Sequence, residues 1–302
     1  MTEVARRERR TWTALIIGGV VVVIIAGVLG WGVMSKRLES AKQMDQAIIM
    51  VESADASVIA IDKVIRAEVT PEIGQQALEL EPTVAPTAAK LIEAVTLINA
   101  AYPSLNNAER AKADLLKKTA KAKLDMLEQA PVILSANVKV ATAQPLAQQA
   151  WDQTLAGDKL ADSAVASYNK LTKEGVQDSA VKNAQAEKAF QSARDLFSQA
   201  ATAFPEAGLD RYVAYVDQKL VQVGISRKSD AAWLAGKPAL ANSFIAAYNK
   251  ADAKGIAMYK ELPPSPITAI ADAYKTLADG PTVLYFEARD KASTADQSLK
   301  AM

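Results

Sequence analysis

The stretch 11-TWTALIIGGVVVVIIAGVLGWGVMS-35 decides how this chain is organised, because its 25 residues include no charged side chain. A helix of that length, at ~1.5 Å per residue, exceeds the ~30 Å hydrocarbon core of a bilayer. The run is longer than the apolar region of a signal peptide, and no A-x-A-like cleavage pattern precedes Lys36. The sequence therefore predicts a retained transmembrane helix over residues 11–35, preceded by a short cytoplasmic tail, 1–10.

Flanking charge predicts the orientation of this span. Arg6, Arg7, Arg9 and Arg10 precede it, whereas only Lys36 and Arg37 follow closely. The positive-inside rule then places the N-terminus in the cytoplasm and residues 36–302 outside the plasma membrane. Ala26 and Gly30 form a small-xxx-small pair that would let two spans associate, although small residues are common in membrane helices generally.

Composition excludes several classes of function. The 35 Lys and Arg residues balance 34 Asp and Glu, which argues against a nucleic-acid-binding protein. The chain has no cysteine and no histidine, so disulfides, thiol nucleophiles and the commonest general base are excluded. No catalytic, cofactor-binding or metal-binding residue is predicted, and we do not expect an enzyme. A cysteine-free outer region without a glycosylation acceptor favours a bacterial cell envelope.

Alanine supplies about one residue in five, which favours closely packed helices and an all-α fold. Residues 36–144 read as a membrane-proximal helical region. Its first helix carries a heptad seam, which indicates either a coiled coil or a bundle helix burying that face. The seam consists of Met44, Val51, Val58 and Ile65 with Ala47, Ala54 and Ile61.

Caps and prolines suggest where the next helices begin and end. Thr70-Pro71 is a typical helix start, Pro82 and Pro86 are expected to break the chain, and Asn106 or Asn107 can cap a basic helix over 107–128. Further on, Ser265 can cap a helix that begins at Pro266. That basic face is either a solvated surface or a contact with lipid or wall polymer.

The stretch between Pro131 and Pro145 is the only strand-like one, because it is rich in β-branched residues. Without a partner strand, it reads as an extended connector or distorted helix and as the boundary between two halves. The second half, 145–302, is predicted to contain two related helical units of about 146–227 and 228–302.

An internal repeat supports these two units. LADSAVASYNKLTKEG (160–175) matches LANSFIAAYNKADAKG (240–255) at eight of sixteen positions, and an Ala-Trp pair lies upstream of each copy. Repeated segments of this kind indicate stacked helical units. We expect the helices that carry Tyr168 and Tyr248 to occupy equivalent places with both rings largely buried.

The repeated residues fall into two groups. The first contains the expected core aromatics and the glycines expected to end their helices in a left-handed cap, namely Trp151, Tyr168, Gly175, Trp233, Tyr248 and Gly255. The second contains polar residues that either bridge to a neighbouring helix or face a partner, namely Asn169, Lys170, Asn249 and Lys250.

Two family resemblances are limited. Residues 186–205 are similar to the second helix of a tetratricopeptide repeat through Ala193, Phe197, Ala200 and Pro205, but the first-helix signature is missing upstream. A membrane anchor followed by alanine-rich helices with Tyr-Asn steps resembles the LemA family in a handful of residues. Neither resemblance assigns the chain to a family.

Two hypotheses for function follow from these patterns. The first is a single-pass envelope protein whose outer helical region binds other proteins as a scaffold or spaces them from the membrane. The second is a ligand-binding or sensory bundle that captures a small molecule between helices and works through a membrane partner.

Overall fold

The structure, a computed structural model, describes residues 31–302, so the predicted cytoplasmic tail, the Ala26/Gly30 pair and most of the predicted span lie outside the described residues. Residues 31–302 are helical throughout and contain no strand, which confirms the all-α prediction. The elements in order are α2 (Trp31–Ile65), α3 (Pro71–Ala101), η2 (Tyr102–Ser104), α4 (Asn107–Tyr168), α5 (Lys173–Ala203), η3 (Pro205–Ala207), α6 (Asp210–Leu234), α7 (Pro238–Glu261) and α8 (Pro266–Lys300).

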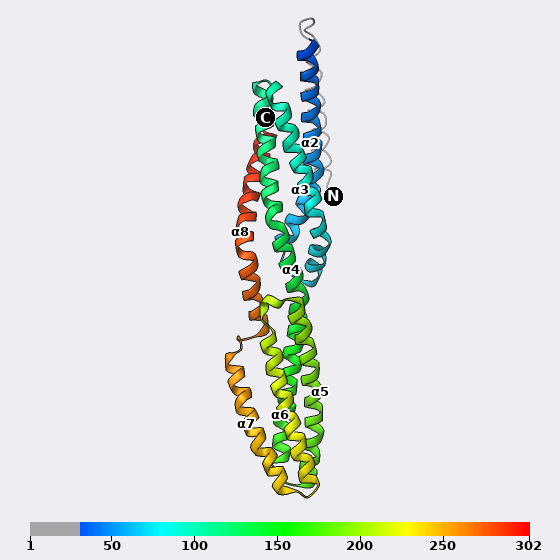
Figure 1. Cartoon of the computed structure of the whole chain (residues 1–302), viewed down its shortest axis with the longest axis vertical. Helices are drawn as coiled ribbons and strands as arrows, with labels where there is room; N and C mark the ends of the chain where they lie inside the picture. Colours follow the sequence, from blue (N-terminus) through cyan, green and yellow to red (C-terminus); the bar gives the residue numbers. More distant parts are fainter. Residues whose placement is uncertain (1–30) are drawn as a thin grey trace.

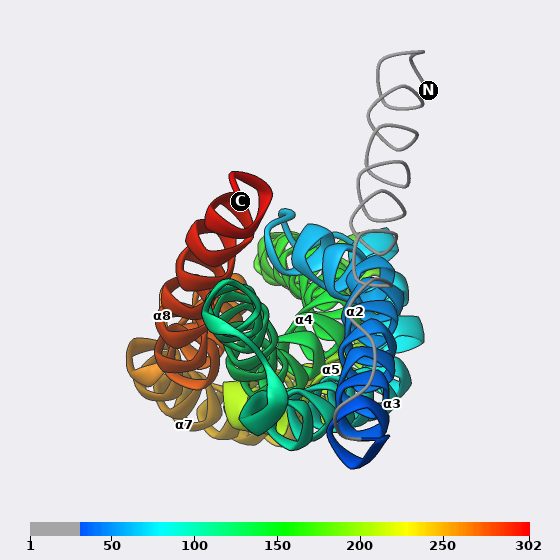
Figure 2. The ribbon, with the colours of Figure 1, turned by 90° about the horizontal axis from the view of Figure 1, so that it is seen from above.

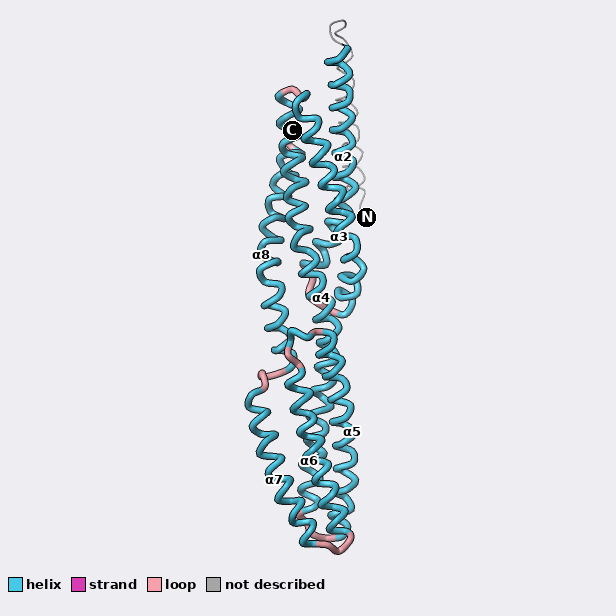
Figure 3. The backbone as a smooth tube through the Cα atoms, in the orientation of Figure 1, coloured by secondary structure: helices cyan, strands magenta, loops and turns pink. Residues whose placement is uncertain are grey.

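These helices form two antiparallel bundles placed end to end in one rod (Figure 1). We call them the proximal bundle, made of α2, α3, the first part of α4, and α8, and the distal bundle, made of the rest of α4 with α5, α6 and α7. The view from the end shows the helices of the proximal bundle arranged around α4 (Figure 2). The start of α2, the α3–α4 turn and the C-terminus lie at the same end of the rod (Figures 1 and 3).

Helix α4 connects the two bundles without a break. Its 62 residues correspond to roughly 90 Å of helix, at ~1.5 Å per residue. It packs against α3 and α8 in the proximal bundle and against α5 in the distal bundle. A single rigid element therefore sets the length of the rod.

The heptad seam of the first helix is the buried face of α2. Six of its seven residues are buried in the proximal core and Met44 packs against that core. This confirms the bundle-helix interpretation of the seam. Leu91 and Ile98 of α3, Ile133 and Leu134 of α4, and Tyr285 of α8 complete the same core.

The junction between the bundles is tightly packed. Phe204 and Leu209, which flank η3, share one buried cluster with Ile270 of α8. Tyr274 donates a hydrogen bond to Asn137 Oδ1 at 3.0 Å, and Tyr212 donates one to the Pro263 carbonyl at 3.0 Å. Apolar packing and hydrogen bonds therefore hold the two bundles together at this point.

Local capping agrees with the sequence at three helix starts. The Thr70 side chain accepts a hydrogen bond from the Ile73 amide, Asn106 and Glu109 form a capping box, and Ser265 caps α8 with Pro266 at its first position. These side chains satisfy backbone donors that a helix cannot pair internally.

The proline-based helix breaks were wrong. Pro82 and Pro86 lie inside α3, and Pro131 and Pro145 lie inside α4. An interior proline costs about 3 kcal/mol. The buried face of α3 continues on both sides of its prolines, from Ala77 to Ile98, and burial of several apolar side chains outweighs that cost.

The strand-like stretch between Pro131 and Pro145 is part of α4, so it is not an extended connector, and the helical alternative is the one that forms. Its residues Ile133, Leu134, Ala136 and Val140 are buried, and this burial stabilises a helix in a β-branched segment. The structure also groups the chain differently from the predicted division at residue 144, because α8 packs beside the first part of α4.

One helical segment of residues 31–302, Pro71–Ser104, is long and apolar enough to cross a membrane by length and composition alone. In the proximal bundle its α3 portion packs against α2 and α4.

Candidate functional site

The interior of the distal bundle changes from apolar to polar toward its far end. Ser179, Asn183, Ala186, Phe190 and Ala193 follow one another along a single buried stripe of α5. Spacings of three and four residues put them all on one face of the helix. The polar members of the stripe are therefore buried where apolar residues usually lie.

A small cavity opens in this polar region. Its volume is about 40 Å³, close to the space that one water molecule needs. Helix α7 packs on α6 and has no comparable packing against α4, which leaves a space between α4 and α7. Polar side chains line this space. The lining includes Asp158 and Asp162 of α4, Asn183 and Phe190 of α5, Lys219 and Gln222 of α6, and Tyr248 and Asp252 of α7.

An ion pair forms one wall of the cavity. Lys219 Nζ lies 2.9 Å from Asp158 Oδ1 and 5.5 Å from the centre of the Tyr215 ring. Burial raises the pKa of Asp158, although Lys219 opposes this effect. Burial alone would lower the pKa of Lys219, but the Asp158 carboxylate and Tyr215 together more than offset this effect and the pKa is raised. The ammonium group is therefore held in its charged form.

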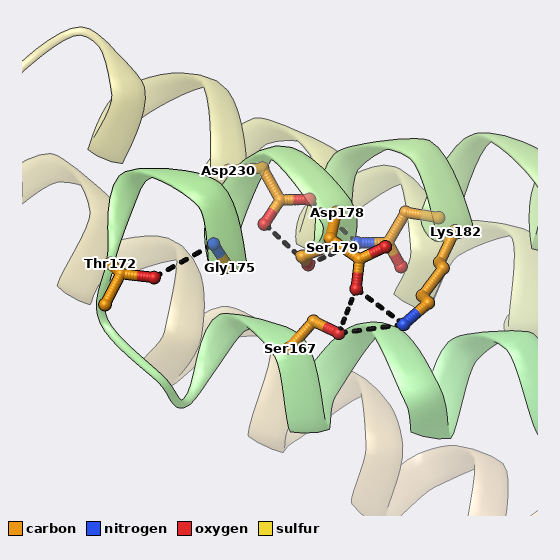
Figure 4. Close-up of polar contacts among 8 residues, drawn as sticks. Ser167, Thr172, Gly175, Asp178, Ser179, Lys182 and Asp230 are labelled. Atoms are coloured by element: carbon orange, nitrogen blue, oxygen red, sulfur yellow. Dashed lines mark hydrogen bonds and ion pairs between the residues drawn. The ribbon is translucent and has the colours of Figure 1, made fainter.

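A buried carboxylate lies between α5 and α6, close to the cavity. Asp230 is only 1% exposed, and it accepts hydrogen bonds from Ser179 Oγ at 2.9 Å and from Asn183 Nδ2 at 2.8 Å (Figure 4). Burial raises the pKa of Asp230, while the two hydrogen bonds work against the rise. Both donors are neutral, so no cation compensates the charge of this carboxylate among the contacts described.

A second polar cluster joins the end of α4 to α5. Ser167 Oγ donates to Asp178 Oδ2 at 2.6 Å, and Lys182 Nζ lies 2.6 Å from the same oxygen (Figure 4). Hydrogen bonds from Lys182 and Ser167 lower the pKa of Asp178. This carboxylate is solvent-accessible, so it differs from Asp230 in both environment and direction of shift.

The two repeat copies adopt different structures. Residues 160–175 end α4, form a turn and begin α5, whereas residues 240–255 lie inside α7. Tyr168 lies at the end of a helix and Tyr248 in the middle of one, so the prediction of equivalent places was wrong. Both tyrosines are partly exposed and neither is fully buried. The reason is positional, since the second copy packs against α6 alone over most of its length.

Both repeated glycines permit close packing and neither ends a helix. Gly175 lies in the first turn of α5, where a Cβ atom would come 2.6 Å from the Ser167 carbonyl oxygen. Leu171, with a φ of 54°, takes the left-handed position in that turn. Gly255 lies inside α7, and a Cβ atom there would come 2.3 Å from Gln222 Nε2.

The remaining predicted residues also lie in the distal bundle. Trp151 packs edge-on against Tyr212, with ring centres 5.9 Å apart, and Trp233 is half-buried near the end of α6. The polar candidates Asn169, Lys170, Asn249 and Lys250 are all exposed, the first two at the α4–α5 turn and the others on α7. A partner-facing role for them stays a prediction.

Sequence analysis missed the four residues that give the site its chemistry, Asp158, Asn183, Lys219 and Asp230. A signal existed for Asn183, because Ser179 and Asn183 continue the periodic stripe that contains Phe190 and Phe197. No comparable signal marked the Asp158–Lys219 pair, whose members are 61 residues apart. Among residues 31–302, no group of three or more acidic, histidine or cysteine side chains could hold a metal ion.

No protein-family model, curated protein or solved structure matches this chain.

Proposed function

We propose that this protein is a single-pass, membrane-anchored rod of a bacterial cell envelope, which acts as a scaffold or spacer and carries its distal bundle away from the membrane. The observation that carries the proposal is the path of the chain. Helix α2, described from Trp31 within the predicted span, leads into a rod in which α4 runs through both bundles. The N-terminal tail would lie in the cytoplasm and the rod outside.

The rod geometry supports spacing for a physical reason. A continuous helix of roughly 90 Å is stiff, and packing on both of its halves prevents it from bending freely. The exposed Asn169 and Lys170 lie in the turn at its far end, where a protein partner would meet them. The proposal assigns no catalytic residues to this protein.

A fluorescence experiment tests the proposed arrangement. The chain has no cysteine, so a single introduced cysteine labels one position. Full-length protein in vesicles is labelled at Lys170→Cys or, as the matched control, at Asn107→Cys at the opposite end. We expect energy transfer to lipid-borne acceptors to be strong from position 107 and almost absent from position 170. Strong transfer from both positions would mean that the rod lies flat and would reject the proposal.

The polar cavity favours ligand binding as a second candidate function. Its charged and amide lining resembles the few convergent polar groups of helical-bundle ligand sites. Because the cavity has room for about one water, a larger ligand requires α7 to move away from α4. Thermal stabilisation by a small cationic or zwitterionic compound, lost in Asp158→Asn but kept in the exposed control Asp195→Asn, would support this function.

A further inference from the structure

The end of the rod where α2 begins combines exposed basic and apolar side chains. Arg37 and Lys42 of α2, Lys112 of α4, and Lys300 of α8 are exposed, and no ion pair is formed by them within residues 31–302. Leu38 is 74% exposed, more than any other large apolar side chain in the described part of the chain. We call this set of five residues the basic tip.

The acidic groups of the neighbouring turn are engaged in internal hydrogen bonds with neutral donors, so they keep their charge. Glu109 accepts a hydrogen bond from the Asn106 amide, and Asp114 accepts one from the Tyr102 hydroxyl at 3.0 Å. Arg110 lies over the Tyr102 ring and donates to the Pro103 carbonyl. These contacts hold the turn rigidly. The nearby segment of α2 also carries two exposed acidic side chains, Glu39 and Asp45.

We propose that the basic tip lies on the surface of an anionic lipid membrane and so orients the rod. This inference rests on the proposed membrane anchor. Leu38 follows the predicted end of the span, Ser35, by three residues or about 4.5 Å of helix. That places it at the height of the headgroups, where an exposed leucine and long basic side chains are both favourable. Each basic residue near an anionic surface strengthens the contact by roughly fivefold.

The α3–α4 turn gives the contact a second point of support. It lies at the same end of the rod as the start of α2 and the C-terminus (Figures 1 and 3). A rod attached through α2 alone could pivot about that helix. Attraction of Lys112 to the same surface restricts the pivot, because α4 is packed rigidly against α3 and α8.

The test uses full-length Asn107→Cys protein that carries a fluorophore and vesicles that contain a headgroup quencher. Asn107 is exposed and begins α4. The vesicles are phosphatidylcholine alone or phosphatidylcholine with phosphatidylglycerol. We expect stronger quenching in the anionic vesicles, and we expect the difference to disappear in high salt, which screens exposed charges. Lys42→Glu/Lys112→Glu should reduce quenching to the level of neutral vesicles.

The matched control places the same charge change at the far end, as Lys170→Glu/Lys237→Glu, and should leave quenching unchanged. Equal quenching in both kinds of vesicle, unaffected by Lys42→Glu/Lys112→Glu, would overturn the inference. Binding to soluble poly(glycerol phosphate) without any response to anionic vesicles would also overturn it, in favour of a wall polymer. Flotation with anionic vesicles only would support the basic tip and reject the anchor, whereas flotation with neither kind would reject both.

Discussion

Asp230 provides the clearest test of the polar interior at the scale of a single residue. Its folded pKa is raised above the ordinary value of 3.8 because it is buried. The folded protein therefore keeps this proton to a higher pH than the unfolded chain does, and the free energy of unfolding falls as pH rises through that window. Asp230→Asn removes the ionisation, and the Ser179 hydroxyl can turn to accept from the new amide.

We predict that Asp230→Asn gains stability relative to the parent protein as pH rises from about 3 to 7. The measurement is the urea midpoint of both proteins across this range. The control is Asp178→Asn, because the pKa of Asp178 is lowered by Lys182 and Ser167. The stability that Asp178 contributes is present above its unfolded pKa and is lost as pH falls, so this variant should lose stability at neutral pH. If both variants gained stability at neutral pH, or both lost it, the opposite pKa shifts of Asp230 and Asp178 would be contradicted.

Residue-level prediction from sequence succeeded where a residue acts through its immediate neighbours. Thr70, Asn106 and Ser265 cap helices because their partners lie three residues further on. The Asp158–Lys219 pair and the buried Asp230 depend on how α4, α5 and α6 meet, which no local pattern encodes. The partner of a buried charge becomes identifiable only once the packing is known.

At the scale of the element, Gly175 tests how closely the start of α5 packs against the end of α4. A Cβ atom there would lie 2.6 Å from the Ser167 carbonyl oxygen, which is backbone and cannot turn aside. We predict that Gly175→Ala forces the first turn of α5 away from the end of α4 and costs about 1–3 kcal/mol. Thermal or urea unfolding of the full-length variant measures this loss.

Gly224 supplies the matched control for that change. It lies inside α6, and no atom beyond its own helix turn and chain neighbours comes within 4 Å of a Cβ placed there. Gly224→Ala should stabilise the protein by up to about 1 kcal/mol, since alanine is the better helix former. Loss of stability in both variants would mean that close packing at Gly175 is not the cause.

The elements also show where sequence reasoning fails for physical reasons. Pro82, Pro131 and Pro145 are strong local helix-breaking signals, yet α3 and α4 continue through them. Tertiary burial on both sides of each proline compensates for the missing hydrogen bond. The repeat misled in the opposite way, because similar residues at 160–175 and 240–255 occupy a helix–turn–helix and a continuous helix.

At the scale of the described molecule, two cores share two helices, α4 and α8. The proximal core is built mainly from α2, α3, α4 and α8, and the distal core from α4, α5 and α6 with residues 269–273 of α8. Because α8 contributes to both cores, and α4 runs through both, neither bundle can lose its structure without exposing part of the other.

We therefore predict a single cooperative unfolding transition for the full chain in detergent micelles. Fluorophores at Asn107→Cys and at Lys170→Cys, at opposite ends of the rod, should report the same midpoint. Ile270→Ala removes a side chain that is 1% exposed at the junction and should cost about 2–5 kcal/mol at both reporters. Val283→Ala, on the exposed face of the same helix, should change stability by no more than about 0.5 kcal/mol. Two separate midpoints, with Ile270→Ala shifting only one of them, would show that the bundles unfold independently and that α4 does not carry stability across the junction.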